Sequence, residues 1–321
     1  MNIAFAGFRH GHIFVLYQDA AERLDVDISY CYEEDEKARK AAETQGVKFN
    51  ASSYEELLSD KNIDAIAIGD YYGKRGKMVI EALKSGKHVI CDKPICTKLS
   101  ELDEIERLAK EKGLVVACML DLRYMPQAKK VKEIIKKGEI GDLHIASFTG
   151  QHCLDYQNRP GWYFEEGKHG GTINDIAIHG VDLIRYVTEK KLTKVNFARV
   201  WNAFADKEPH FADCGQFMAE MGSMAVSADV SYAAPKMNVM MPTYWNFYIW
   251  GAKGMINFNY KEGNIRIYKN EETVVECEEI KINHLEDFIK QIKGEKTIME
   301  TFDVLNSQRQ VLEIQKAADG I

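Results

Sequence analysis

The sequence lacks the patterns that mark membrane proteins, disulfide-rich proteins and nucleic-acid-binding proteins. No run of apolar residues approaches the roughly 18 needed to span a bilayer. The seven cysteines are scattered without a C-x-x-C pair, which indicates reduced thiols and argues against a zinc site or a disulfide framework. The net charge of -7 does not suggest nucleic acid or an anionic membrane as a partner.

Low-complexity segments and internal repeats are also missing, and no basic leader precedes the first apolar run. We therefore expect no signal peptide and, given the reduced cysteines, a cytoplasmic protein. The composition is that of a folded protein, with 45% hydrophobic and 28% charged residues. A chain of 321 residues is long enough for two domains with buried cores.

The first third alternates short apolar runs with amphipathic stretches. Such alternation is typical of a parallel, doubly wound sheet with helices on both faces. The predicted strands and helices occupy, in chain order, residues 3–6, 13–23, 26–32, 36–44, 53–58, 63–68 and 77–85, then a short strand with Val89 and Ile90 at its core, and residues 100–112 and 114–119. Ser100 is the expected cap of the helix it begins.

A glycine turn, Gly7-Phe8-Arg9-His10-Gly11-His12, joins the first strand to the first helix. A strand, a turn and a helix N-terminus in this order can hold a pyrophosphate through backbone N–H groups. In the register G-x-G-x-x-G, Gly7 fits, but Arg9 and His12 replace the second and third glycines, so the turn alone is a weak signal. Arg9 could bind a phosphate instead. His10 and His12 form an H-x-H pair without a third ligand, so we expect no metal.

Three acidic residues, Glu33, Glu34 and Asp35, follow the second strand. An acidic residue about 20 positions beyond the glycine turn accepts hydrogen bonds from the adenosine ribose in dinucleotide-binding folds. Glu33 is the candidate, with Tyr32 beside the ribose or adenine. The acidic cluster favours NAD over NADP, although Arg9 leaves NADP open. Alternatively, these acids only complement the positive end of the next helix.

Charged residues also end the third and fourth strands. Gly69-Asp70 closes the third strand, and Asp92-Lys93 followed by Pro94 closes the fourth, because proline cannot donate to a sheet ladder. Open α/β sheets bind ligands at the carboxyl ends of their strands. Lys93 is therefore a candidate functional residue, and the alternative is an ion pair of little energetic value.

From about residue 140 the pattern changes to a series of strands that would form a mostly antiparallel sheet, with one helix at 173–186 among them. Along that helix Asp175, His179, Asp182 and Tyr186 share one face. This polar stripe suits the wall of a buried cleft or a solvent face. His179 is a candidate for proton exchange, because a free imidazole exchanges protons near neutral pH, and the alternative is a core histidine. The predicted strands are residues 143–150, 194–202, 215–221, 224–232, 245–250 and 264–268.

Four motifs in order resemble those of the Gfo/Idh/MocA oxidoreductases, the glucose–fructose oxidoreductase and inositol dehydrogenase group. Residues 82–94 resemble the family's AL-GKHV-EKP signature with Asp92 for the usual Glu, and residues 121–126 its N-x-R-[FY]-x-P element. Residues 138–141 match its G-x-I-G, and residues 170–179 its G-G-x-L-x-D-x-G-x-H helix. The loop at 70–75 departs from the P-x-x-x-H pattern of many members.

The resemblance covers nearly the whole chain and implies an α/β protein of two domains. Residues 1–123 would form an N-terminal Rossmann dinucleotide-binding domain that holds NAD, with NADP possible. Residues 124–321 would form a C-terminal α+β domain with a mostly antiparallel open sheet, for substrate binding and assembly into a homodimer or homotetramer. The last helix, near 303–318, would pack back on the first domain.

The resemblance also implies site residues. The implied catalytic residues are Lys93, Asp175 and His179, with Lys93 reaching the substrate from the cofactor side. The cofactor would contact Gly7, Phe8, Arg9, His10, Gly11, His12, Tyr32, Glu33, Gly69, Asp70, Asp92, Lys93, Pro94 and Arg123. The substrate would contact Lys93, Tyr124, His152, Tyr156, Trp162, Asp175 and His179.

The implied function is an NAD(P)-dependent dehydrogenase that acts on a CH–OH group of a sugar, inositol or related polyol. An NAD-dependent glycosidase of the same family and a non-catalytic sugar or cofactor sensor are the alternatives. A pure sensor would not need Lys93, Asp175 and His179 together. The sequence does not name the polyol or the direction of the reaction.

Overall fold

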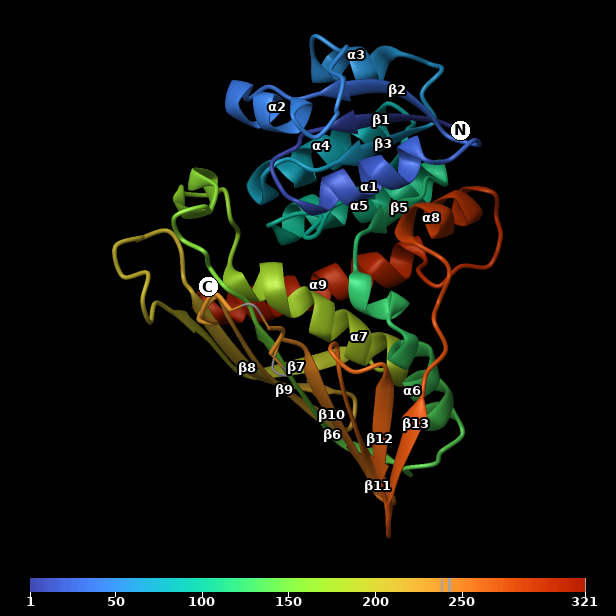
Figure 1. The fold of residues 1–321 in the computed structure, drawn as a ribbon, viewed down its shortest axis with the longest axis vertical. Helices are drawn as coiled ribbons and strands as arrows, with labels where there is room; N and C mark the ends of the chain where they lie inside the picture. Colours follow the sequence, from blue (N-terminus) through green and yellow to red (C-terminus); the bar gives the residue numbers. More distant parts are fainter. Residues whose placement is uncertain (238, 242–243, 321) are drawn as a thin grey trace. The chain divides into compact units, whose positions relative to one another are not determined.

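The computed structural model describes residues 1–237, 239–241 and 244–320 (Figure 1). The chain divides into two compact units. Unit 1 comprises Met1–Met119 and Ile282–Asn306, and unit 2 comprises Leu120–Lys281 and the residues from Ser307 onward. Among the described residues, no helix is both long and apolar enough to cross a membrane.

Unit 1 is built on a parallel sheet of five strands in the order β2-β1-β3-β4-β5. β3 and β4 are nearly continuous apolar runs, as expected of strands that helices cover on both faces. The strand order reverses at β1 and β3, and ligands of such sheets bind at that reversal. The strands are β1 (Asn2–Ala6), β2 (Asp27–Tyr32), β3 (Ala65–Ile68), β4 (His88–Cys91) and β5 (Val116–Cys118).

Within unit 1, one or two helices follow each of the strands β1 to β4. Asp35 and Ser53 cap α2 and α3 by accepting hydrogen bonds from backbone N–H groups. The expected cap at Ser100 is wrong, because α5 begins at Leu99 after Lys98. α8 comes from near the end of the chain, yet its Leu285 and Phe288 belong to the core of unit 1. The helices are α1 (His12–Ala21), α2 (Glu36–Glu43), α3 (Tyr54–Ser59), α4 (Tyr72–Lys84), α5 (Leu99–Lys112) and α8 (His284–Ile292).

Unit 2 contains an eight-stranded sheet in the order β13-β12-β11-β10-β6-β9-β8-β7. Among its described residues, β6 and β9 pair in parallel and the other neighbouring strands pair antiparallel. Its strands are β6 (Leu143–Gln151), β7 (Leu192–Trp201), β8 (Cys214–Met221), β9 (Met224–Ser231), β10 (Asn246–Gly251), β11 (Gly254–Asn259), β12 (Asn264–Tyr268) and β13 (Glu272–Glu276). β11 and β13 were not predicted from the sequence. The α/β fold class, a parallel sheet followed by a mostly antiparallel one, is confirmed.

The helical elements of unit 2 include a π-helical turn, η3, that runs directly into α7. They are η1 (Asp121–Tyr124), α6 (Pro126–Lys136), η2 (Gly161–Phe164), η3 (Ile173–Ala177) and α7 (Ile178–Thr188). The last helix, α9 (Thr301–Ala318), begins in unit 1 and continues in unit 2.

The two faces of the unit 2 sheet differ. Phe148, Phe217 and Phe247 are buried on one face, across which α7 lies (Figure 1). The opposite face leaves several large apolar side chains exposed, by 37% to 57% of their surface. These residues are Ile145, Phe197, Met218, Tyr248 and Trp250.

We predict that Gly180→Ala destabilises the protein. Gly180 is buried in α7, and a methyl group there would collide with the ring of Phe148. Alanine favours helices, but overpacking a core costs about 1–3 kcal/mol and should outweigh that gain. The matched control is Gly161→Ala, because Gly161 has open space around its Cα. Urea unfolding should show a loss only for Gly180→Ala, and equal stabilities would contradict this account of the packing.

Candidate active site

The glycine turn after β1 is held by the ends of β2 and β3. Gly7 has φ +82° and donates its N–H to Tyr32 O at 2.9 Å, while Arg9 N donates to Gly69 O at 3.0 Å. A side chain at Gly7 would strike the backbone of Asp70, 2.6 Å from its nitrogen, so glycine is required. The turn leads through Gly11 into the first N–H groups of α1. This close approach and this helix start fit the diphosphate of a dinucleotide.

Glu33 ties the turn to the end of β2. The carboxylate accepts hydrogen bonds from Phe8 N at 2.6 Å and from Arg9 Nε and Asp35 N, both at 2.8 Å, and the residue is nearly fully buried. The structure therefore gives Glu33 a role in fixing the turn. Its hydrogen bond to a ribose stays a prediction.

Arg9 occupies the position of the missing second glycine, and acidic groups surround its guanidinium. Besides Glu33, these are the carboxylates of Glu34 at 3.8 Å, Asp35 at 3.7 Å and Asp70 at 4.0 Å. Lys74 adds a second cation, 2.6 Å from Glu34 and 3.0 Å from Asp70. Four carboxylates thus face two cations, and this excess of negative charge disfavours an additional phosphate.

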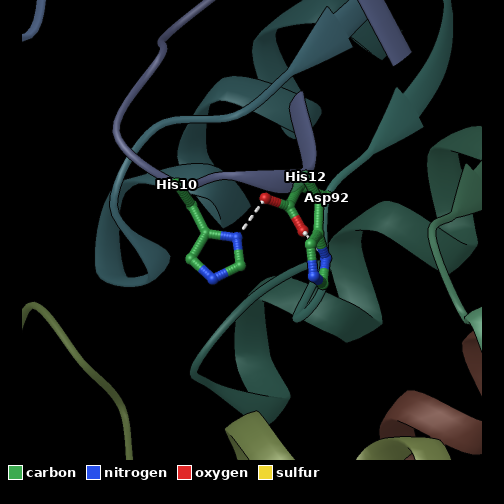
Figure 2. A group of neighbouring side chains, drawn as sticks. All are labelled: His10, His12 and Asp92. Carbon is green, nitrogen blue, oxygen red and sulfur yellow. Dashed lines mark hydrogen bonds and ion pairs between the residues drawn. The ribbon is translucent and has the colours of Figure 1, made fainter. Parts of the chain in front are cut away.

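Asp92, directly after β4, is completely buried and meets both histidines of the glycine turn (Figure 2). His10 Nδ1 lies 2.6 Å from Oδ2, and His12 Nδ1 lies 3.1 Å from Oδ1. An ionised carboxylate can only accept, so each histidine carries its proton on Nδ1. Burial alone would raise the pKa of Asp92, but these donors and the Arg75 guanidinium hold that pKa well below its usual value.

Arg75 is a residue that the sequence analysis did not single out. It is fully buried, and its Nη2 lies 3.1 Å from Asp92 Oδ2. Its remaining donors reach the carbonyl oxygens of Asp70 at 2.7 Å, Lys93 at 2.5 Å and Pro94 at 3.2 Å. Arg75 therefore fixes the backbone at the ends of both β3 and β4. In the sequence, Arg75 was marked only by its place in the loop at 70–75, which departs from the family pattern.

Lys93 lies at the carboxyl end of β4, as predicted. The residue is 6% exposed, and its ammonium lies 5.9 Å from the centroid of the Tyr72 ring. The same ring faces the Arg75 guanidinium at 4.6 Å. The peptide bond between Lys93 and Pro94 is cis. Arg75 thus holds the backbone of Lys93 in place, and Lys93 directly follows Asp92, the carboxylate that binds the glycine turn.

In unit 2, Asp175 belongs to the π-helical turn η3 rather than to regular α-helix. Its carboxylate accepts a short hydrogen bond from the hydroxyl of Tyr232 and lies 3.4 Å from His169 Nε2. The wider π turn changes the spacing between Asp175 and His179 that an α-helix predicts. Single π turns inside helices occur often at functional sites.

His179 and His152 both contact Trp245, with ring centroids 5.6 Å and 5.5 Å apart. His152 also lies near Tyr232, the partner of Asp175. The structure therefore brings three predicted residues, Asp175, His179 and His152, into one cluster. Tyr232 and Trp245, which the sequence analysis did not identify, connect them, and no local pattern marks either residue.

Arg123 forms a buried pair with Asp182 in unit 2. Arg123 Nε lies 2.6 Å from Asp182 Oδ2 and Nη2 lies 2.5 Å from Oδ1, and Ser307 Oγ donates to Oδ1 at 2.6 Å. The guanidinium also lies 5.0 Å from the Tyr186 ring. Asp182 and Tyr186, two residues of the predicted polar stripe, thus belong to this buried network. A cofactor contact of Arg123 stays a prediction.

The remaining predicted substrate residues are spread over unit 2. Trp162 is buried against Tyr163, whose ring lies 6.3 Å from that of Tyr232. Tyr156 is half exposed and donates to Glu208. Tyr124 ends η1. Trp162 thus reaches the aromatic surroundings of Asp175 through Tyr163, and Tyr156 packs on Phe164.

Two models of one protein family match the chain. Residues 1–120 match an oxidoreductase family with an NAD-binding Rossmann fold, and residues 128–257 match the GFO/IDH/MocA C-terminal domain. Each match falls largely within one of the two units of the structure.

Known proteins similar to the chain include oxidoreductases. The uncharacterized oxidoreductase YrbE of Bacillus subtilis is 30% identical over 196 residues, 58% of this chain and 54% of that protein. The myo-inositol 2-dehydrogenase of Thermotoga maritima is 26% identical over 201 residues, 61% of this chain and 57% of that protein. The chain thus spans a little over half the length of these curated relatives.

A solved structure with a similar fold is that of a levoglucosan dehydrogenase in complex with NADH and levoglucosan. The TM-score is 0.82 at 21% sequence identity, and the match covers 100% of this chain and 96% of that one.

We predict that His10 makes stability fall as the pH is lowered. Burial lowers the pKa of His10 from 6.5 to about 4, although the charge of Asp92 opposes this shift. Between these two values the unfolded chain binds a proton that the folded chain does not. The free energy of unfolding should therefore fall across this window, by at most about 3 kcal/mol.

Urea unfolding across the same window tests this prediction. His10→Asn keeps a donor near the position of Nδ1 but does not titrate, so its stability should fall less than that of the wild type. Because Asp92 titrates only at still lower pH, it does not account for the difference. Equal pH dependence in the two proteins would contradict the prediction.

Proposed function

The chain belongs to the Gfo/Idh/MocA oxidoreductase family, and we propose that it is an NAD-dependent dehydrogenase of a sugar, inositol or related polyol. Family membership confirms the resemblance that the four sequence motifs indicated. One observation carries the proposal. Lys93 lies at the carboxyl end of β4, directly after the buried carboxylate that holds the glycine turn, in a unit that matches an NAD-binding family.

The residues of unit 1 support NAD as the cofactor. The Gly7 turn and the start of α1 would bind the diphosphate, and Glu33 and Tyr32 would lie near the adenosine ribose. The four carboxylates around Arg9 and Lys74 favour NAD over NADP, because a 2′-phosphate would add negative charge to an acidic region.

The proposed reaction is the oxidation of a CH–OH group, in which NAD accepts a hydride from the carbon. The chain must then remove the hydroxyl proton and stabilise the developing alkoxide. His179 is the proposed base, since an imidazole exchanges protons near neutral pH. Lys93 is the proposed cation that would favour the alkoxide electrostatically. Asp175, which Tyr232 orients, would hydrogen-bond substrate hydroxyls.

The cluster around Asp175 supports a polyol as the substrate. Trp245 and Tyr232 offer flat apolar faces to the C–H groups of a sugar ring, while His152 offers a polar group for hydroxyls. One of the relatives is a myo-inositol 2-dehydrogenase, and the similar solved structure contains levoglucosan. The glycosidase and the sensor remain the alternatives, and no specific feature favours either of them.

We also propose a cytoplasmic homodimer or homotetramer that assembles through the exposed face of the unit 2 sheet. Trp250 pairs with Ile145, and a row of paired residues continues from Tyr248 to Met218 and Phe197. Apolar patches of this kind on a sheet mark protein–protein contacts. A second copy of the chain would bury them by matching the same surface on both subunits.

A substrate screen with NAD⁺ and NADP⁺ tests the proposed activity. We expect NADH to accumulate with a free polyol or sugar, and NAD⁺ to be preferred. Release of aryl alcohol from aryl glycosides without net NADH would favour the glycosidase. Tight NADH binding with neither activity would favour the sensor, and either result would overturn the dehydrogenase.

We predict that Lys93→Ala and His179→Ala each lower turnover at least about a hundredfold, the scale of losing an acid–base or electrostatic group. Both variants should still bind NADH in a fluorescence titration. A loss of turnover with NADH binding retained shows that the variant is folded and that the chemical step is impaired. Lys110→Ala is the control, because Lys110 is exposed on α5. Near wild-type turnover in either site variant would remove that residue from the mechanism.

We predict that Met218→Glu and Trp250→Glu shift the protein to a monomer, because each places a charge in the proposed interface. Light scattering after size exclusion measures the mass. Leu24→Glu is the control, since Leu24 is an exposed apolar residue of unit 1. A monomeric wild type, or unchanged mass in both sheet variants, would refute assembly through this face.

A further inference from the structure

Three side chains with metal-binding atoms converge at the carboxyl ends of the strands of unit 1. His10 lies in the turn after β1, His12 is the first residue of α1, and Asp92 follows β4, about 80 positions later in the sequence. Their ligand atoms all lie within 4.8 Å of one another. Figure 2 shows both imidazole rings beside the one carboxylate. Asp92 supplies the third ligand that the H-x-H pair lacks in the sequence.

We propose that His10, His12 and Asp92 bind one divalent transition-metal ion. The ion would lie between the two Nδ1 atoms and the carboxylate, where the hydrogen bonds now run. Two imidazoles and one carboxylate are a common set of protein ligands for such ions. This proposal goes beyond the dehydrogenase activity and does not depend on it.

The spacing of the donor atoms supports the site. Metal–nitrogen and metal–oxygen bonds of about 2.0–2.2 Å place neighbouring ligand atoms about 3 Å apart. The two Nδ1 atoms lie 2.6 and 3.1 Å from carboxylate oxygens of Asp92. The two rings stand at 78° to each other with centroids 4.7 Å apart, so they do not stack face to face. Small side-chain rotations would therefore seat an ion.

The charges around the cluster define what kind of ion it would hold. Arg75 contacts Oδ2 of Asp92, so Oδ1, which faces His12, is the oxygen better placed for the ion. The Arg75 charge offsets that of Asp92, and binding should therefore be moderate rather than very tight. The nitrogen ligands favour zinc, cobalt or nickel over magnesium or calcium, which prefer sites made of oxygen atoms.

The cluster is open to solvent on one side. The side chain of His12 is 33% exposed and that of His10 14%, whereas Asp92 is fully buried. Three protein ligands leave at least one coordination position for water or an anion. If the turn also holds a dinucleotide diphosphate, as proposed above, the ion would add positive charge to that turn. The test below uses no cofactor, so the two proposals fail separately.

Titration of the metal-free protein with Co²⁺ and Zn²⁺ tests the site. Calorimetry should show about one ion per chain, and the visible spectrum of bound Co²⁺ should report nitrogen and oxygen ligands. His10→Asn and His12→Asn each keep a hydrogen-bond donor for Asp92 but remove an imidazole. We expect each variant to weaken binding at least about tenfold, as loss of one ligand should.

His144→Asn is the matched control, because His144 is an exposed histidine on β6 in unit 2. It should bind the ion as the wild type does. Circular dichroism checks that every variant is folded, and His12→Asn, at the more exposed position, keeps the test available if His10→Asn unfolds. Absence of stoichiometric binding in the wild type, or equal binding in His12→Asn, would overturn the site and leave a metal-free hydrogen-bond network.

Discussion

The buried carboxylate of Asp92 is the group on which the candidate cofactor side of the site depends. An unpaired ionised carboxylate in a protein interior costs several kcal/mol, so this one must be compensated. Arg75, itself fully buried, lies against one oxygen, and His10 and His12 share the carboxylate. Because Arg75 also binds the carbonyls of Asp70, Lys93 and Pro94, a single charge pair fixes the ends of two strands and the backbone of Lys93.

Unit 2 also contains two buried carboxylates whose charge is compensated by neighbouring groups. Asp182 is compensated by Arg123 and Ser307, which joins η1, α7 and α9 through one buried pair. Asp175 is instead compensated by a neutral hydroxyl, that of Tyr232, with His169 nearby. The first pair therefore supports the fold, and the second joins Asp175 to the aromatic cluster of unit 2.

Elements with strong periodicity or buried apolar runs could be predicted from the sequence, and elements without them could not. β3 and β4 are short apolar runs and were predicted. β13 is mostly exposed and rich in glutamate, so its sequence carries no strand pattern. α8 is an exception: Asn283 caps it and Leu285 and Phe288 lie on its buried apolar face, so its sequence does carry a helix signal, which was overlooked. The π turn at 173–177 was missed because its residues fit an α-helical repeat equally well.

The sequence by itself determined the family, the parallel sheet and the placement of Lys93 at the end of β4, because these depend on motifs and on neighbouring residues. Only the tertiary structure decided which side chains meet. β3 separates β1 from β4 in the sheet, so no register rule joins His10 and His12 to Asp92. That contact, like the one between Tyr232 and Asp175, spans dozens of residues and depends on the path of the turns and on the need to compensate buried charge.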